Sequence, residues 1–136
     1  MDTTFEFKFS RNNQSYQLIF QFDLARYSHQ IIHSFLSSNS LYEPGTSNLL
    51  ANILMPGDTF IDVGAHIGYF TLFASRLVGD TGTVLSFEPE ASNYERVLNH
   101  LRINQIANVL PFRWAVSNTS AVVDLFTDPG NDGAII

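Results

Sequence analysis

The chain has 136 residues, of which 45% are hydrophobic, 13% aromatic and 15% charged. A chain of this length can build one compact domain, and its composition is too apolar for a disordered protein. The net charge is −6, and residues 56–136 hold four Lys or Arg against nine Asp or Glu, a balance of −5. Because no cluster of basic residues is present, nucleic acid is not an expected partner. The absence of cysteine excludes disulfides and a thiol nucleophile.

The amino-terminal residues carry no targeting signal. Residues 1–7 lack the basic and apolar parts of a signal peptide, and no apolar run approaches the roughly 18 residues of a membrane span. We therefore expect a cytoplasmic protein that does not interact with membranes.

Residues 1–45 predict a β-hairpin followed by a short helix. Apolar and polar residues alternate over residues 5–9 and 16–22, and the polar residues 11–15 lie between them. Residues 26–36 have helical spacing. His29 and His33 have the i, i+4 spacing of a zinc pair, but no third ligand is evident. We expect them on a solvated helix face, with no metal, and the Phe-rich hairpin to form core or an interface.

Residues 46–136 predict an α/β domain on which residues 1–45 pack as an extension. Residues 43–47 predict a turn with hydroxyl caps, and residues 48–55 the helix that it starts. The pattern then predicts a strand at 59–63, a turn at 64–68, a helix at 69–78 and a strand at 83–88. This alternation favours a sheet that begins parallel.

The rest of the chain predicts one more helix and two more strands. Residues 92–95 form a capping-box pattern with Ser92 as the cap, and the helix should end near Asn104. A third strand is predicted at 108–114. Pro111 cannot donate to a ladder, which places that strand at a sheet edge or a bulge, and Trp114 is expected to pack. A fourth strand is predicted at 121–126, before a loop at 128–133.

The turn after the first strand of the α/β domain is a candidate ligand site. Asp62 ends that strand, Gly64 and Gly68 follow, and ligands of open α/β sheets bind at the carboxyl ends of strands. We expect the two glycines to give a ligand clearance to the backbone. Glu88 ends the next strand, where a carboxylate can bind a ribose diol. Together these residues predict an adenosine-type cofactor site.

The same turn departs from the phosphate-binding patterns. His66 occupies the place of the second glycine in the dinucleotide fingerprint, and no Gly-Lys-Ser/Thr follows Gly68. A ligand with a ribose but no phosphate fits better, and S-adenosyl-L-methionine is the common one. His66 could orient the loop or act as a general base; the first role is favoured.

The order of motifs resembles the FkbM family of S-adenosyl-L-methionine-dependent O-methyltransferases. Residues 62–71 resemble methyltransferase motif I, D-V-G-A-x-x-G-x-x-T, and residues 87–89 resemble the family's acidic second-strand motif. The resemblance begins near Tyr42-Glu43-Pro44, includes Ala115-Val116 and covers the chain to its end. It implies the Rossmann-like three-layer sandwich of class I methyltransferases, of which this chain would form the front half after its hairpin and helix.

The resemblance also assigns roles to individual residues. Asp62 and the backbone of Gly64, Ala65, His66 and Gly68 would hold the amino-acid end of the cofactor, and Glu88 the ribose. Pro89, Glu90, Ala115 and Val116 would lie along the adenine. No catalytic residue is assigned, and the methyl acceptor would be a hydroxyl of a small molecule or a sugar.

The family continues with a further strand that carries an acidic D-x-E-G motif, which this chain does not contain. Two functions therefore stay open, a methyltransferase and a non-catalytic remnant or interaction module. The missing strands would leave the far edge of strand 59–63 unpaired, so we expect self-association through that edge.

Overall fold

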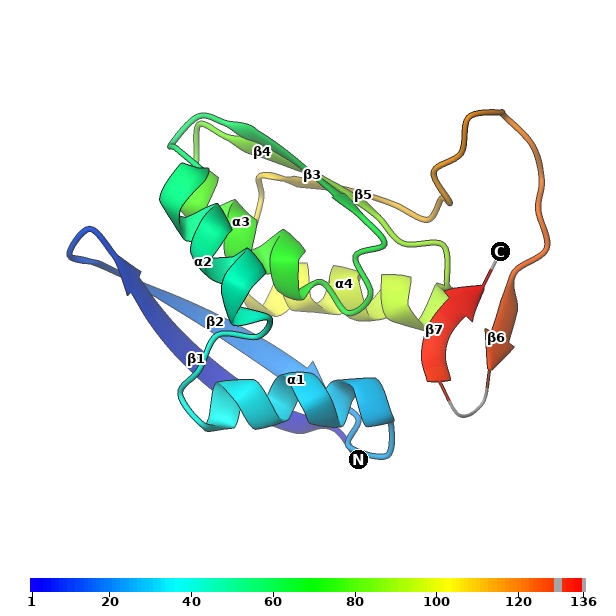
Figure 1. The fold of residues 1–136 in the computed structure, drawn as a ribbon, viewed down its shortest axis with the longest axis horizontal. Coiled ribbons are helices and arrows are strands. Elements are labelled where there is room, and N and C mark those ends of the chain that lie inside the picture. Colours follow the sequence, from blue (N-terminus) through cyan, green and yellow to red (C-terminus); the bar gives the residue numbers. More distant parts are fainter. Residues whose placement is uncertain (129–130, 136) are drawn as a thin grey trace.

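A parallel three-stranded sheet lies at the centre of the fold. The computed structural model describes residues 1–128 and, as backbone only, residues 131–135. The sheet contains β3 (Thr59–Val63), β4 (Thr83–Phe87) and β5 (Val109–Phe112), in the order β3-β4-β5 (Figure 1). Asp62 lies opposite Ser86 in its register. The α/β class, the parallel start and the edge position of the strand with Pro111 are confirmed.

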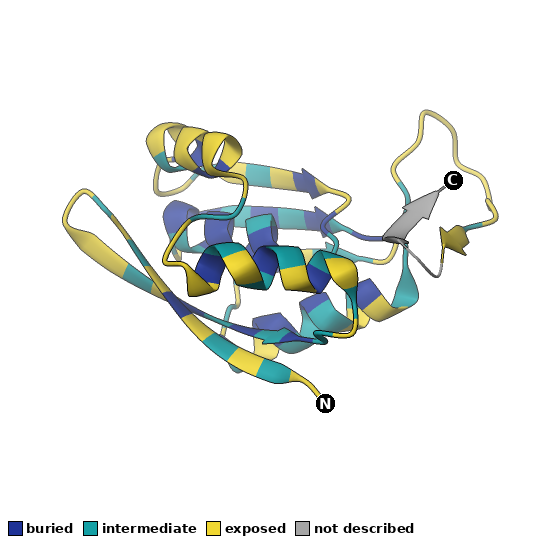
Figure 2. Cartoon of the chain, turned by 60° about the horizontal axis from the view of Figure 1, so that its bottom comes forward, coloured by how far each residue is buried: buried dark blue, intermediate teal, exposed yellow. Residues whose placement is uncertain are grey.

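Two helices cover one face of the sheet. They are α3 (Tyr69–Val78), between β3 and β4, and α4 (Ala91–Ile103), between β4 and β5. Leu72 and Phe73 of α3, Val84 of β4 and Val97 of α4 are fully buried between these layers. On the opposite face Ile61, Val63 and Leu110 are exposed. Figure 2 shows buried residues concentrated in the central layers and exposed residues at the tip of the hairpin and in the segment before the carboxyl end.

The predicted hairpin packs against the helices, on the side away from the sheet (Figure 1). It consists of β1 (Thr3–Arg11) and β2 (Gln14–Phe22), paired antiparallel. Phe7, Phe20 and Phe22 are buried in the core, and Phe20 stacks on Tyr69 with ring centroids 6.1 Å apart. The expectation that its phenylalanines form core is confirmed.

Two side chains at the carboxyl end of α4, those of His100 and the capping residue Asn104, hydrogen-bond to the outer edge of β2. Asn104 accepts from the Ile19 amide at 2.7 Å and donates to the Ile19 carbonyl at 2.7 Å. His100, one turn earlier, accepts from the Gln21 amide through Nε2 at 2.9 Å. These bonds replace the partner strand that an edge otherwise lacks. His100 Nδ1 lies 2.8 Å from the Ile67 carbonyl, so the same ring also holds the loop after β3.

Arg11 joins the hairpin to the ends of two helices. Its guanidinium donates to the carbonyls of Ala51 and Leu54 at the end of α2 (Pro44–Ile53), and to Leu77 near the end of α3. A cation at a helix carboxyl terminus satisfies free carbonyls and complements the helix dipole.

The helices before the sheet differ from the prediction in two ways. The prediction started the second helix at residue 48, but α2 starts at Pro44, because proline suits the first helical position. The first helix, α1 (Tyr27–Ser37), does not expose His29, which is 1% exposed and accepts from the Asp23 amide at 3.0 Å. The prediction that His29 lies on a solvated helix face was therefore wrong.

The start of α4 also corrects the prediction. The cap is Glu90 and not Ser92, since the Glu90 carboxylate accepts from the amides of Ser92 and Asn93 at 3.0 and 2.8 Å. A carboxylate two residues earlier starts the helix sooner, accepts from its first free amides and adds a favourable charge at the helix amino terminus. The predicted end at Asn104 is confirmed.

The carboxyl-terminal segment contains less strand than predicted before residue 126. The third strand is shorter than residues 108–114, and residues 121–125 form no strand; β6 is Phe126–Asp128 and pairs with β7 (Asn131–Ile135). Val122 and Val123 are exposed, and β-branched residues form a strand only where a partner and a packing surface meet them. The predicted loop at 128–133 instead contains the start of β7; its residues 129 and 130 lie outside the described residues.

Across residues 1–128 and 131–135, none of the helices combines the length and the apolar character that crossing a membrane requires.

Candidate functional site

The turn between β3 and α3 has an unusual backbone. Gly64, His66 and Gly68 all have positive φ, at 81°, 54° and 90°. A Cβ on Gly64 would meet nothing within 4 Å, whereas one on Gly68 would lie 3.2 Å from Val97 of α4. Gly64 therefore leaves space in front of the turn, as expected of a binding loop. Gly68 instead allows close packing of the turn on α4.

Four amides of this turn are already bonded inside the protein. Gly64 and Ala65 donate to the Phe87 carbonyl at 2.9 and 3.0 Å, and Gly68 donates to Ala65 at 2.8 Å. His66 donates to Glu88 Oε2 at 2.7 Å. A phosphate-binding loop needs such amides free to point at the anion. The amides of Gly64, Ala65, His66 and Gly68 are therefore not available to a phosphate.

Glu88 is a buried carboxylate at the carboxyl end of β4. It is 5% exposed, and its second oxygen accepts from the Glu90 amide at 2.9 Å. Burial raises its pKa, an effect that the bonds from Glu90 and His66 oppose and the nearby charges of Glu90 and Asp62 increase. Each oxygen keeps lone pairs for a further donor. Glu88 thus joins the turn to the start of α4 and can still bind a diol.

Asp62 is the second carboxylate of the site. It is 9% exposed and accepts from Thr71 Oγ1 of α3 at 2.6 Å, and Thr71 lies 2.8 Å from the Ser86 hydroxyl of β4. Burial raises the pKa of Asp62 against the lowering effect of Thr71. A positive charge bound nearby would favour the ionised form of both carboxylates.

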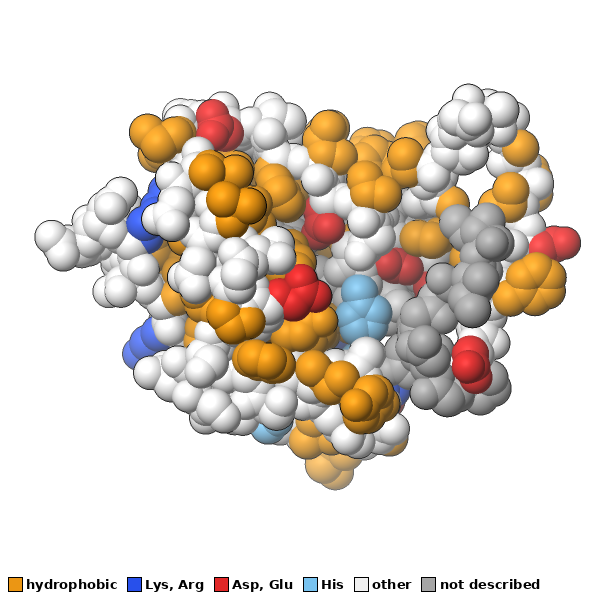
Figure 3. Space-filling model, viewed as in Figure 1, with side chains coloured by type: hydrophobic (Ala, Val, Ile, Leu, Met, Phe, Trp, Pro, Cys, Tyr) orange, Lys and Arg blue, Asp and Glu red, His pale blue; other side chains and the backbone are white. Residues whose placement is uncertain are grey.

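A cavity of about 340 Å³ lies in front of the turn. Gly64, Ala65 and His66 line it on one side, and Glu43 and Ser28 come from the segments before the sheet. Ser28 Oγ lies 3.0 Å from His66 Nε2. Figure 3 shows acidic side chains gathered around a histidine in the middle of this face.

The residues predicted to lie along the adenine do not line the cavity in front of the turn. Pro89, Ala115 and Val116 line a separate cavity of about 740 Å³, which shares no lining residue with the first. Trp114, expected to be packed, is 62% exposed, although its ring stacks on Phe112 at 4.9 Å. The structure therefore brings Gly64–His66 together with Glu43, and Pro89 together with 115–116, while Asp62 and Glu88 are buried at the strand ends.

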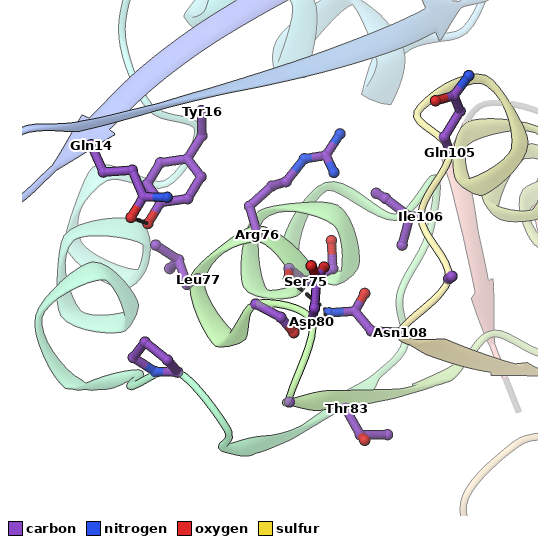
Figure 4. A pocket seen from close by; sticks show the side chains of 14 residues that line it. Gln14, Tyr16, Ser75, Arg76, Leu77, Asp80, Thr83, Gln105, Ile106 and Asn108 are labelled. Carbon is purple, nitrogen blue, oxygen red and sulfur yellow. Dashed lines mark hydrogen bonds between the residues drawn. The ribbon is translucent and has the colours of Figure 1, made fainter.

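Another cavity, of about 790 Å³, lies at the opposite ends of the strands (Figure 4). Arg76 is among the residues that line it, and its guanidinium donates to the carbonyls of Gln17 and Asn104. Ligands of parallel α/β sheets bind at the carboxyl ends of strands, so this cavity is not the cofactor site.

Two residues that line the cavity in front of the β3–α3 turn were not among the predicted site residues. Glu43 was read as part of a turn and of the family resemblance, without a role in binding, and Ser28 carried no signal. Both depend on how the first 45 residues fold against the loop, which no local pattern reveals. Within the described residues, no group of three or more His, Asp or Glu side chains could hold a metal ion.

The family is decided by residues 62–134, which match the model of the methyltransferase FkbM domain. The chain belongs to the FkbM methyltransferase family. The cofactor of this family is S-adenosyl-L-methionine, and the site fits it: the carboxylates suit a ligand with positive charge, and the bonded amides of the turn suit one without phosphate.

Solved structures with a similar fold are also methyltransferases. TYW2 of M. jannaschii, solved in complex with AdoMet, is 20% identical with a TM-score of 0.51, and the match covers 78% of this chain and 42% of that one. A protein-L-isoaspartate O-methyltransferase is 17% identical with a TM-score of 0.50, covering 81% and 28%. A protein described as an rRNA methylase, from Clostridium thermocellum, is 21% identical with a TM-score of 0.51, covering 52% and 39%.

These similarities show the Rossmann-like methyltransferase fold. The FkbM chain spans 28% to 42% of the length of these three solved structures. No curated protein matches the chain.

Proposed function

We propose that this FkbM domain binds S-adenosyl-L-methionine at the carboxyl ends of β3 and β4 and serves the O-methylation of a hydroxyl on a small molecule or sugar. The observation that carries the proposal is the pair of buried carboxylates, Asp62 and Glu88, beside a turn whose amides are bonded internally. That arrangement favours a cationic adenosine cofactor over a nucleotide phosphate.

Different residues bind different parts of the cofactor. Glu88 accepts from the ribose hydroxyls, and Gly64–His66 border the amino-acid end, with Asp62 and Gly68 fixing the turn. Pro89, Ala115 and Val116 border the adenine, since they line one cavity and Pro89 directly follows Glu88 in the chain. S-adenosyl-L-methionine supplies an electrophilic methyl group, and the protein's part is to hold an acceptor hydroxyl in line with it.

The placement of the basic side chains favours a small acceptor over a nucleic acid. Arg11, Arg76 and Arg96 form internal contacts, the last with Asp2, and Arg26 donates to Ser92. Side chains held in this way do not form a patch for phosphates. One similar structure is described as an rRNA methylase, and RNA binding is therefore worth measuring as the competing acceptor class.

A non-catalytic interaction module is the second candidate. It is favoured by the uncovered apolar face, where Ile61, Val63 and Leu110 are exposed. A methyltransferase would need further structure over this face to shape an acceptor pocket.

Calorimetry distinguishes cofactor classes directly. We expect the chain to bind S-adenosylhomocysteine and not to bind ATP or NAD, because the amides of Gly64, Ala65, His66 and Gly68 are bonded inside the protein and not available to a phosphate. Incubation with labelled S-adenosyl-L-methionine and small hydroxyl acceptors, with RNA in parallel, then tests transfer. Binding of ATP or NAD in preference to S-adenosylhomocysteine would overturn the proposal. Binding without transfer to any acceptor would favour the interaction module.

A further inference from the structure

The cavity in front of the β3–α3 turn contains a carboxylate with no role so far. Glu43 precedes α2, and its backbone lies in the left-handed region at φ 42°. Carboxylates at this position ordinarily cap the helix by accepting from its first amides, but the Glu43 side chain makes no such bond. Glu43 lines the cavity of about 340 Å³ instead.

Aromatic rings form the wall beside Glu43. Tyr42, Tyr69 and Phe70 all line the cavity; the Tyr42 and Tyr69 centroids are 5.3 Å apart, and those of Tyr69 and Phe70 are 5.0 Å apart. Burial raises the pKa of Tyr69 to about 12, so its ring carries no charge at neutral pH. Burial, then the charge of Glu43 and a side-chain hydrogen bond between the two residues, raise the pKa of Tyr42.

A carboxylate beside aromatic rings is an environment for a cation. An aromatic ring attracts a positive group electrostatically, and a carboxylate beside it adds a full negative charge. The cavity adjoins Gly64, where the missing Cβ leaves space, and therefore continues into the proposed cofactor site. The group of the cofactor that this wall can bind is its α-ammonium.

We propose that Glu43 binds the α-ammonium group of S-adenosyl-L-methionine, beside the rings of Tyr42 and Tyr69. The proposal rests on the proposed function of the strand-end site. It makes α2 part of the cofactor site and gives the segment before the sheet a role in binding. Ser28 and His66 line the same cavity, where the hydroxyl and the imidazole can meet the ligand's carboxylate.

Calorimetry with two ligands tests the assignment. S-adenosylhomocysteine carries the ammonium, and its desamino analogue keeps the adenosine and the carboxylate without it. In Glu43→Gln we expect affinity for S-adenosylhomocysteine to fall about 10-fold, the low end for a charge-assisted bond at a partly exposed site, and affinity for the desamino analogue to stay unchanged. Glu95→Gln, which removes an exposed carboxylate on α4, is the matched control and should bind both ligands as the unmodified chain does.

The possible results distinguish a failure of the Glu43 proposal from a failure of the proposed cofactor site. If Glu43→Gln binds S-adenosylhomocysteine with full affinity, or loses both ligands equally, Glu43 does not bind the ammonium, although the chain still binds the cofactor. Should the variant fail to fold, the unmodified chain decides, because equal affinity for the two ligands overturns the proposal. Binding of neither ligand by the unmodified chain contradicts the cofactor site itself.

Discussion

The two faces of the β3-β4-β5 sheet are built from alternate residues of the same strands but have different surroundings. Asp62, Val84 and Ser86 point to the helix side and are buried. Ile61, Val63 and Leu110 point to the other side and are exposed. Because adjacent residues on one strand meet a packed layer and an uncovered surface, the helix side carries the stability and the buried carboxylate, and the open side contributes little to either.

Paired leucine substitutions should show this contrast most strongly. Leu72 of α3 is fully buried, whereas Leu110 of β5 is 53% exposed. We expect Leu72→Ala to lower the free energy of unfolding by about 3 to 4 kcal/mol, because it leaves a cavity under the sheet. Leu110→Ala should change it by about 0.5 kcal/mol or less. Denaturant unfolding measures both, and comparable losses would show that the open face is covered in solution.

His100 should make the helix side sensitive to acid. It is fully buried, and burial lowers its pKa from 6.5 to about 4. His100 binds a proton near pH 6.5 in the unfolded chain but only near pH 4 in the folded chain. Its contribution to the free energy of unfolding is therefore fully present above pH 6.5 and is lost as the pH falls toward 4. The loss amounts to about 3 kcal/mol.

Comparison with His100→Gln isolates the effect of this histidine. The raised pKa values of Asp62 and Glu88 act in the opposite direction, but they are present in both proteins. Thermal or denaturant unfolding between pH 7 and pH 4 should therefore show a steeper loss in the unmodified chain. Parallel curves for the two proteins would mean that His100 already binds its proton in the folded state.

The open face should promote self-association. β3 is the outer strand of its described sheet, and both Ile61 and Val63 are exposed beside its edge. A charge placed there opposes strand pairing. We expect the unmodified chain to elute as a species larger than 15.3 kDa in size-exclusion chromatography with light scattering, and Val63→Glu to shift it toward the monomer. A monodisperse monomer with a sharp thermal transition would instead identify a complete domain.

The sequence predicted the regions where local pattern and tertiary packing agree. The strand at 59–63 and the helix at 69–78 match β3 and α3 at both ends, because apolar residues and glycines mark their limits. The predicted strand at 121–126 was wrong for residues 121–125, which pair with no strand in the described part of the chain and leave Val122 and Val123 exposed. Strand propensity alone could not reveal that absence.

The candidate site could be predicted only where its residues belong to a recognisable order of sequence motifs. Asp62, the turn and Glu88 follow one motif order, so the sequence indicated them together. Glu43 and Ser28 reach the same cavity through the fold of the first 45 residues. The burial of His29 and the edge-completing role of His100 likewise depend on the hairpin, which the sequence predicted as an element but not in its contacts.

We expect the buried carboxylate at the end of β4 to bind the cofactor's ribose. Calorimetry with S-adenosylhomocysteine on Glu88→Ala tests it most directly, beside Glu95→Ala as a surface control and with thermal melting of both. We expect Glu88→Ala to lose about 10- to 150-fold in affinity, which corresponds to roughly 1.5 to 3 kcal/mol for hydrogen bonds to a charged group, while Glu95→Ala binds normally. Unchanged affinity in a folded Glu88→Ala protein would contradict the account.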